Sequence, residues 1–139
     1  MKVVRKIPAL TAGQYAYLVR QSVRLPTGDP TPEIADIFFV TDVEEPLKYK
    51  GYLLGTDGTC RLVCVRNKQG EYHINRMYKG ERNTIHYDLL QVFNEKRAIA
   101  FIEAIEEQIR LDAKKAAELV NKFQRAKLMF LTVSRTFRG

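Results

Sequence analysis

The sequence predicts an α+β fold, and three observations carry that prediction. Turn residues recur at short intervals over residues 47–87, which is typical of a four- to five-stranded antiparallel meander. Residues 88–136 contain no Gly and no Pro, which favours helix. A length of 139 residues fits one domain, because cores usually divide only above roughly 250 residues. We therefore expect residues 1–139 to form a single domain, with 88–133 as a long C-terminal helical segment packed on one sheet face.

The first predicted element is an N-terminal helix over residues 12–24. Thr11 is followed three residues later by Gln14, which matches a capping box, and Pro26 lies just beyond the expected end. The apolar residues between these limits are spaced to share one helical face. The sequence therefore predicts a helix packed at the N-terminus of the domain.

A loop and then the strands follow. Residues 25–33 hold three prolines and predict a loop, and the apolar, partly β-branched residues 34–41 predict a strand. A helix that begins at Pro32 is the alternative, because Glu33 and Asp36 suit a first helical turn. The strands predicted for the meander are residues 47–54, 59–66, 71–78 and 83–87.

The C-terminal segment carries apolar residues at heptad spacing along one side. These are Ile102, Ile109, Ala116, Phe123 and Phe130. Asp112 falls on the same stripe and suits a helix N-cap, so the segment is one long helix or two helices of about 94–111 and 113–133. The stripe exceeds what one sheet face can cover, which predicts a partner-binding surface. Its residues are Phe123, Leu128, Met129 and Phe130.

The net charge of +7 is unevenly distributed. Residues 28–47 carry six acids and no base, so the rest of the chain sums to +13. This excess favours an anionic partner such as nucleic acid, although a solvated basic surface explains it equally well. The acidic first half and basic second half of the helical segment also favour antiparallel pairing across a homodimer.

Simple hairpin registers would gather cations and aromatic rings on one face of the sheet. That face holds Lys48, Lys50, Tyr52, Arg61, Tyr72, Arg76 and Tyr78. Cations would follow the phosphates of a single strand while bases stack on the tyrosines. Lys114 and Lys115 in the basic C-terminal block extend this predicted site. The alternative is that Val63 and Val65 make this face the core, because a slip of one residue at any turn reverses the faces.

Residues that carry catalytic or metal chemistry are few. Cys60 and Cys64 share one predicted strand about 13 Å apart, at about 3.3 Å per residue, too far to bind one metal. Cys64 would lie opposite His73 in a simple hairpin, which leaves a Cys-His dyad as a minor alternative. The chain contains no phosphate-binding glycine loop and no dinucleotide fingerprint. We therefore expect no enzymatic activity, no metal and no cofactor.

The expected location is the cytoplasm, because no leader and no disulfide framework are evident. No apolar stretch approaches the roughly 20 residues that span a membrane, so no membrane partner is expected. Residues 61–74 followed by a helix resemble the sheet-plus-helix PUR-type repeats, and this resemblance implies binding of single strands. The leading hypothesis is a non-enzymatic protein that binds single-stranded DNA or RNA. The alternative is a protein–protein adaptor or inhibitor, such as a regulatory or phage-type accessory factor, acting through the acidic segment 29–45 or the C-terminal helix.

Overall fold

A computed structural model describes residues 10–20, 28–45, 48–68, 71–78, 81–92, 94–111 and 116–138 of the chain; the side chains of residues 66–91 lie outside that description. The elements are β1 (Tyr15–Arg20), β2 (Ala35–Glu45), β3 (Lys48–Leu54), β4 (Cys60–Lys68), β5 (Glu71–Tyr78), β6 (Glu81–Val92), α1 (Glu95–Leu111) and α2 (Ala116–Arg138). The predicted α+β class is confirmed. The expected four- to five-stranded sheet is corrected, because the described residues form six strands.

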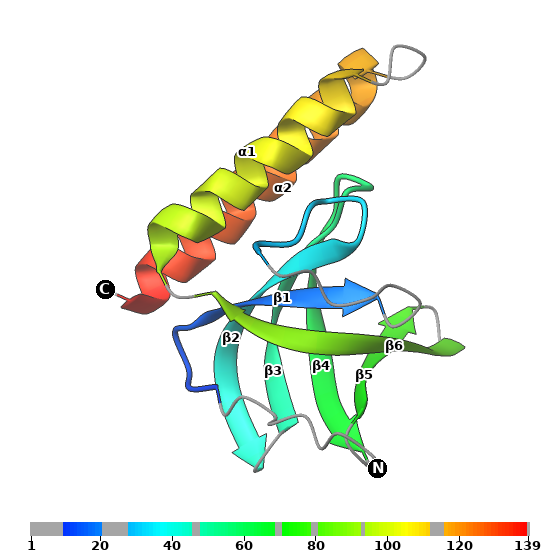
Figure 1. Cartoon of the computed structure of the whole chain (residues 1–139), viewed down its shortest axis with the longest axis vertical. Coiled ribbons are helices and arrows are strands. Elements are labelled where there is room, and N and C mark those ends of the chain that lie inside the picture. Colours follow the sequence, from blue (N-terminus) through cyan, green and yellow to red (C-terminus); the bar gives the residue numbers. More distant parts are fainter. Residues whose placement is uncertain are drawn as a thin grey trace.

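The strands form a closed antiparallel barrel in the order of the chain, with β6 returning to pair with β1 (Figure 1). Closure removes the exposed edges that an open meander would leave. The register between β2 and β3 shifts after Val40 and again after Val43, and such bulges bend a strand. The long strand β2 therefore curves around the barrel.

Gly51 of β3 allows the closest approach between two strands of the barrel. It lies opposite Val40 of β2. A Cβ at this position would overlap the carbonyl oxygen of Phe39 and would lie 2.9 Å from Cζ of Phe38. Only glycine lets β2 and β3 pair here without displacing the backbone.

The barrel interior is one apolar cluster. Its members come from the inward positions of the first four strands and from the residue before the first turn: Leu10, Ala16, Leu18, Phe38, Val40, Tyr49, Leu53, Val63 and Val65. The hydroxyl of Tyr49 accepts a hydrogen bond from the backbone N–H of Leu10 at 3.0 Å. The N-terminal part of the described chain is thereby attached to the barrel.

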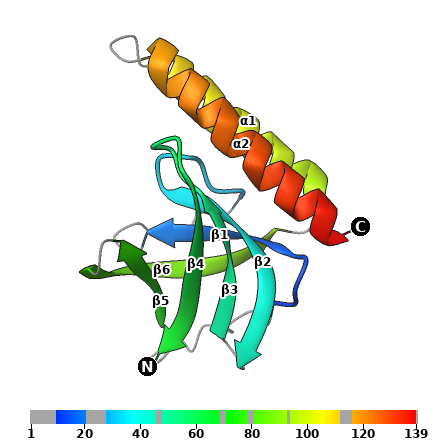
Figure 2. The ribbon, with the colours of Figure 1, turned by 180° about the vertical axis from the view of Figure 1, so that it is seen from behind.

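The two helices form an antiparallel hairpin across the outer face of β1, the first half of β2 and the adjoining ends of β3, β4 and β6 (Figures 1 and 2). Aromatic rings make the contact: the Tyr17 and Phe101 ring centroids lie 5.0 Å apart, and those of Tyr15 and Phe39 also lie 5.0 Å apart. Phe130 of α2 packs on both Tyr15 and Phe39, at 6.2 and 6.5 Å. The helical segment thus packs on one face of the sheet, as predicted. The strands that contribute most to this face are β1 and β2, the first two strands of the described chain.

The predicted N-terminal helix is wrong, because residues 15–20 form strand β1. Tyr15, Tyr17 and Val19 pack against the helices while the residues between them fill the barrel, so the run is apolar throughout and lacks the alternation of a half-buried strand. The capping-box residues do bond, with the Thr11 N–H donating to Gln14 Oε1 at 2.9 Å. They close a turn that contains Gly13 at φ 92° rather than begin a helix.

The C-terminal segment is two helices, α1 and α2, which is the second of the two alternatives that the sequence left open, and α1 ends at Leu111. Residues 88–92 belong to β6, so the helical segment begins at Glu95 rather than at 88. The N-cap is Asn94, whose Oδ1 accepts the N–H of Arg97 at 2.9 Å. Within the described residues, neither helix has the length and apolar content needed to cross a membrane.

Candidate functional site

Helix α2 has one face buried against the barrel and another that is open to solvent. The buried side chains are Phe123, Ala126, Phe130 and Ser134. On the exposed side lie Lys122, Arg125, Leu128 and Met129, which we call the α2 outer face. Leu128 is 68% exposed and Met129 47% exposed. Two adjacent apolar side chains open to water on a helix whose other face is fully packed are typical of an interaction surface.

The cations of the α2 outer face have no acidic partner among the described residues. Lys122 and Arg125 are both exposed, and neither makes an ion pair there. Lys127 differs, because its Nζ lies 3.0 Å from Glu106 of α1. The positive charge of the outer face is therefore not neutralised by the helix hairpin.

The acidic α1 and the basic α2 complement each other within one chain. Glu106 pairs with Lys127 of α2 and with Arg110 of its own helix, at 3.0 and 2.8 Å. Arg135 of α2 reaches Glu95 of α1 at 3.6 Å. The charge asymmetry that favoured pairing across a homodimer is thus used inside the hairpin, and the homodimer stays a prediction.

The structure separates the four residues predicted for partner binding. Leu128 and Met129 are exposed on the α2 outer face, as that prediction requires. Phe123 and Phe130 are fully buried between α2 and the barrel, so their assignment to an exposed stripe is wrong. The physical reason is β1, which adds covered sheet surface where the sequence predicted a helix.

The predicted nucleic-acid face is not assembled by the observed strand register. Lys50 lies opposite Cys64 and Tyr52 opposite Leu62, one residue away from the simple hairpin, because the Gly55 N–H bonds the Thr59 carbonyl and lengthens the loop. Lys48, Lys50 and Tyr52 therefore lie on the barrel exterior. Arg61 shares the other side of the wall with Val63 and Val65 of the interior cluster.

The remaining predicted residues do not restore that face. By register, Tyr72, Arg76 and Tyr78 lie on the same side of the wall as Val65, and their side chains lie outside the described residues. Lys114 and Lys115 also lie outside them.

Three of the four described side chains of this set, those of Lys48, Tyr52 and Arg61, make local contacts. Lys48 pairs with Glu44 at 3.1 Å and Arg61 with Asp57 at 3.4 Å. Tyr52 packs partly buried against the helix–barrel core, so its ring is no open stacking surface.

Cys64 and His73 are not directly opposite each other, as a Cys-His dyad in a simple hairpin would require. Cys64 lies opposite Asn75, and His73 lies opposite Arg66 and His86. Burial raises the pKa of the Cys60 thiol to about 11, which makes it a poor nucleophile at neutral pH. Among the described residues no group of three or more His, Cys, Asp or Glu side chains is placed to hold a metal ion.

The sequence placed Lys122 and Arg125 in the basic C-terminal block but did not set them apart within it, because cations near a helix C-terminus are also explained by the helix dipole. Their spacing did carry a signal. Positions 122, 125 and 129 recur at helical intervals on the side of α2 away from Phe123 and Phe130. That signal becomes visible only when the buried face of α2 is known.

Comparisons of the chain with protein-family models, with curated proteins and with solved structures found no match. The resemblance of residues 61–74 to PUR-type repeats gains no support from them. The geometry of the chain itself is therefore the basis for the functional proposal.

Proposed function

We propose that the protein is a protein-binding module that holds an acidic amphipathic segment of another protein on the α2 outer face. The observation that carries the proposal is the exposure of Leu128 and Met129 beside Lys122 and Arg125. The opposite face of α2 is already committed to the core, so a partner that binds the outer face leaves the fold unchanged.

The apolar pair supplies most of the binding free energy in this proposal. Burying one exposed Leu or Met side chain contributes about 1.5–3 kcal/mol. Arg125 lies about one turn and Lys122 about two turns before Leu128 and Met129 along the helix, where carboxylates of a partner would meet them. Such charge complementarity raises the association rate and sets the orientation of the partner. An amphipathic helix with apolar and acidic positions at helical spacing matches both features.

Nucleic acid is the weaker occupant of the same surface. Phosphates would also neutralise Lys122 and Arg125. The α2 outer face has no aromatic ring, however, and an apolar pair at its centre contributes nothing to phosphate binding. We therefore argue for a protein segment and keep binding of single strands as an outcome of the test.

The test uses a synthetic helical peptide with leucines along one face and glutamates along the other, titrated with the full chain by fluorescence anisotropy. We expect saturable binding that weakens about tenfold in a Leu128→Ser/Met129→Ser variant. Leu62→Ser is the matched control, because Leu62 is a 51% exposed leucine on the barrel. Its binding should equal that of the unchanged protein.

Three results would contradict the proposal. The first is equal binding by the control and by the α2 variant. The second is peptide binding that is absent while a single-stranded oligonucleotide binds with a salt slope near about −0.7 per phosphate contacted. The third is a dimer in sedimentation equilibrium that Leu128→Ser/Met129→Ser dissociates, which would assign the face to a second copy of the chain.

A further inference from the structure

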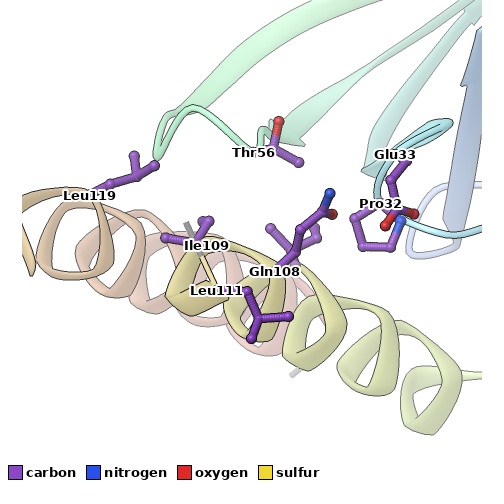
Figure 3. Close-up of a pocket in the computed structure, with 8 residues that line it drawn as sticks. Pro32, Glu33, Thr56, Gln108, Ile109, Leu111 and Leu119 are labelled. Carbon is purple, nitrogen blue, oxygen red and sulfur yellow. The ribbon is translucent and has the colours of Figure 1, made fainter. Parts of the chain in front are cut away.

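A cleft of about 570 Å³ lies between the helix hairpin and two loops of the barrel (Figure 3). The apolar walls come from the helices: Ile105, Ile109 and Leu111 of α1 and Leu119 of α2. Leu111 is 75% exposed, so this wall is open to a ligand from solvent. The volume falls within the roughly 300–1,000 Å³ that is usual for small-molecule sites.

The loop between β3 and β4 forms a fixed edge of the cleft. Asp57 Oδ1 accepts the Thr59 hydroxyl at 2.6 Å and the Thr59 N–H at 3.2 Å. A Cβ on Gly58, which has φ 79°, would lie 3.1 Å from Cγ of Lys122 and 3.3 Å from Cδ1 of Leu119. The loop is therefore held internally and docked closely on α2, so the cleft is formed before any ligand arrives.

Gln108 of α1 supplies an unsatisfied hydrogen-bond acceptor to this cleft. Its side chain extends from α1 toward the barrel loops that carry Thr56 and Pro32 (Figure 3). Its Oε1 atom is buried, and no described residue donates a hydrogen bond to it. A buried acceptor without a donor costs free energy that a donor on a ligand would recover. The terminal amide torsion is soft, so the oxygen turns toward a ligand at little cost.

The electrostatic character of the cleft is opposite to that of the chain. Among the described residues that line it there is no Lys, Arg or His, although the net charge of the protein is +7. Glu33 lies at the rim, where a hydrogen bond from the Thr31 side chain lowers the pKa of its carboxyl group. The polar groups of the cleft include two acceptors, the Glu33 carboxylate and the orphan carbonyl oxygen of Gln108, together with the Gln108 amide nitrogen and the Thr56 hydroxyl, which donate hydrogen bonds.

We infer that the cleft binds a small organic cation: an apolar group that bears an ammonium or guanidinium. The apolar part would fill the space along Ile109 and Leu111. The head group would donate to Gln108 Oε1 and face the carboxylate of Glu33. The volume of the cleft favours a free small molecule as the occupant. The inference is independent of the proposed function, because the cleft shares no lining residue with the α2 outer face.

The test compares three probes with one carbon skeleton: isoamylammonium, isoamyl alcohol and isovalerate. Each is titrated into the full chain at constant ionic strength, and the methyl NMR signals of Ile105, Ile109, Leu111 and Leu119 are followed. We expect dissociation constants of about 1 mM for probes of this size, far weaker than the ceiling of about 1.5 kcal/mol per non-hydrogen atom. We expect isoamylammonium to bind most tightly, the alcohol next and the carboxylate least.

Variants separate the two polar contacts. Gln108→Met keeps the size of the side chain and removes the acceptor, so it should weaken isoamylammonium about tenfold. It should leave the alcohol within about twofold, because the cleft itself stays intact. Glu33→Gln should weaken the cation about threefold through loss of charge at an exposed rim. Gln124→Met makes the same change as Gln108→Met at an exposed position of α2 outside the cleft and should change nothing.

The inference is overturned if isovalerate binds as tightly as isoamylammonium, or if no probe gives saturable shifts of these methyl signals. It is also overturned if both Gln108→Met and Glu33→Gln leave cation binding unchanged. Loss of all three probes in Gln108→Met, with Glu33→Gln weakening the cation alone, would still support a cation site.

Discussion

Strand β1 and the first half of β2 are buried on both faces, whereas β3 and β4 are buried mainly on one. Residues 15–19 and 35–40 are each at most 5% exposed, because the helices cover one face and the barrel interior takes the other. In β3 and β4 burial largely alternates, and Leu62 is 51% exposed between buried and half-buried neighbours. The helix hairpin therefore divides the barrel wall into a covered and an uncovered part.

This difference explains the sequences of the two regions. A strand with two buried faces is apolar at nearly every position, with Asp36 as the exception in residues 35–40, so it loses the period of two that identifies a strand. A strand with one buried face keeps that period. The hairpin that covers β1 and β2 also leaves its own far side, the α2 outer face, without a partner in the described part of the chain. The same packing of the helices therefore buries the outer face of β1 and leaves the α2 outer face exposed.

The largest expected effect lies where the covered strand β2 meets the uncovered strand β3. Gly51→Ala should abolish the folded state, because the new Cβ overlaps the Phe39 carbonyl and the strand pair cannot close. Near-ultraviolet circular dichroism and chemical denaturation measure this. Gly28→Ala is the matched control, since Gly28 is exposed with no atom within 4 Å of a Cβ, and it should change the unfolding free energy by less than about 0.5 kcal/mol. A cooperatively folded Gly51→Ala variant would contradict the strand register.

The second effect contrasts one apolar residue from each part of the wall. Phe39→Ala removes a fully buried ring that contacts Tyr15 and Phe130, and it should lower the unfolding free energy by about 3–5 kcal/mol. Leu62→Ala on the uncovered wall should cost less than about 1 kcal/mol. Urea denaturation of both variants measures the difference. Equal losses would show that the hairpin does not cover β2.

The sequence predicted only some of the structural features on which these experiments depend. Glycine-rich turns marked the strands of the meander, and Asp112 on the apolar stripe marked the break between the helices. The helix predicted for residues 12–24 failed because Tyr15 to Val19 pack on two sides. The predicted nucleic-acid face is not assembled, because the loop before Thr59 is one residue longer than in a simple hairpin. This shift places Arg61 on the opposite side of the barrel wall from Lys50 and Tyr52. Neither two-sided packing nor loop register is encoded in local spacing.

A smaller effect tests the attachment of the two helices to each other. Glu106→Gln removes the charge that pairs with Lys127 and Arg110. The Glu106 side chain is only 13% exposed in the wild type, so its ion pairs are partly shielded from water. The unfolding free energy should fall by about 1 kcal/mol, and by less at high salt because part of the pair is screened. Glu103→Gln, at an exposed position of α1 without an ion pair among the described residues, should change nothing measurable. An equal loss of unfolding free energy in both variants would contradict the stabilising role of the Glu106 ion pairs.

The smallest effect concerns the thiol next to the covered core. Because burial raises the pKa of Cys60 to about 11, its thiolate fraction at neutral pH is about 100-fold below that of a thiol at 9.0. In a Cys64→Ala background, Cys60 should therefore react with iodoacetamide about 100-fold more slowly than in the unfolded chain, and the rate should rise about tenfold per pH unit up to about pH 10. A rate equal to that of the unfolded chain would show that Cys60 is not packed against the helices.

The most direct test of the central claim is chemical-shift mapping of the acidic leucine–glutamate peptide on the isotopically labelled full chain. The claim is that the helix hairpin covers β1 and the first half of β2 with its buried face and binds a partner with the α2 outer face. It predicts saturable perturbations that are largest at the methyl groups of Leu128 and Met129, with those of Leu62 on the uncovered wall unchanged. Perturbations centred on Leu62 and its neighbours in β3, or none at saturating peptide, would contradict it.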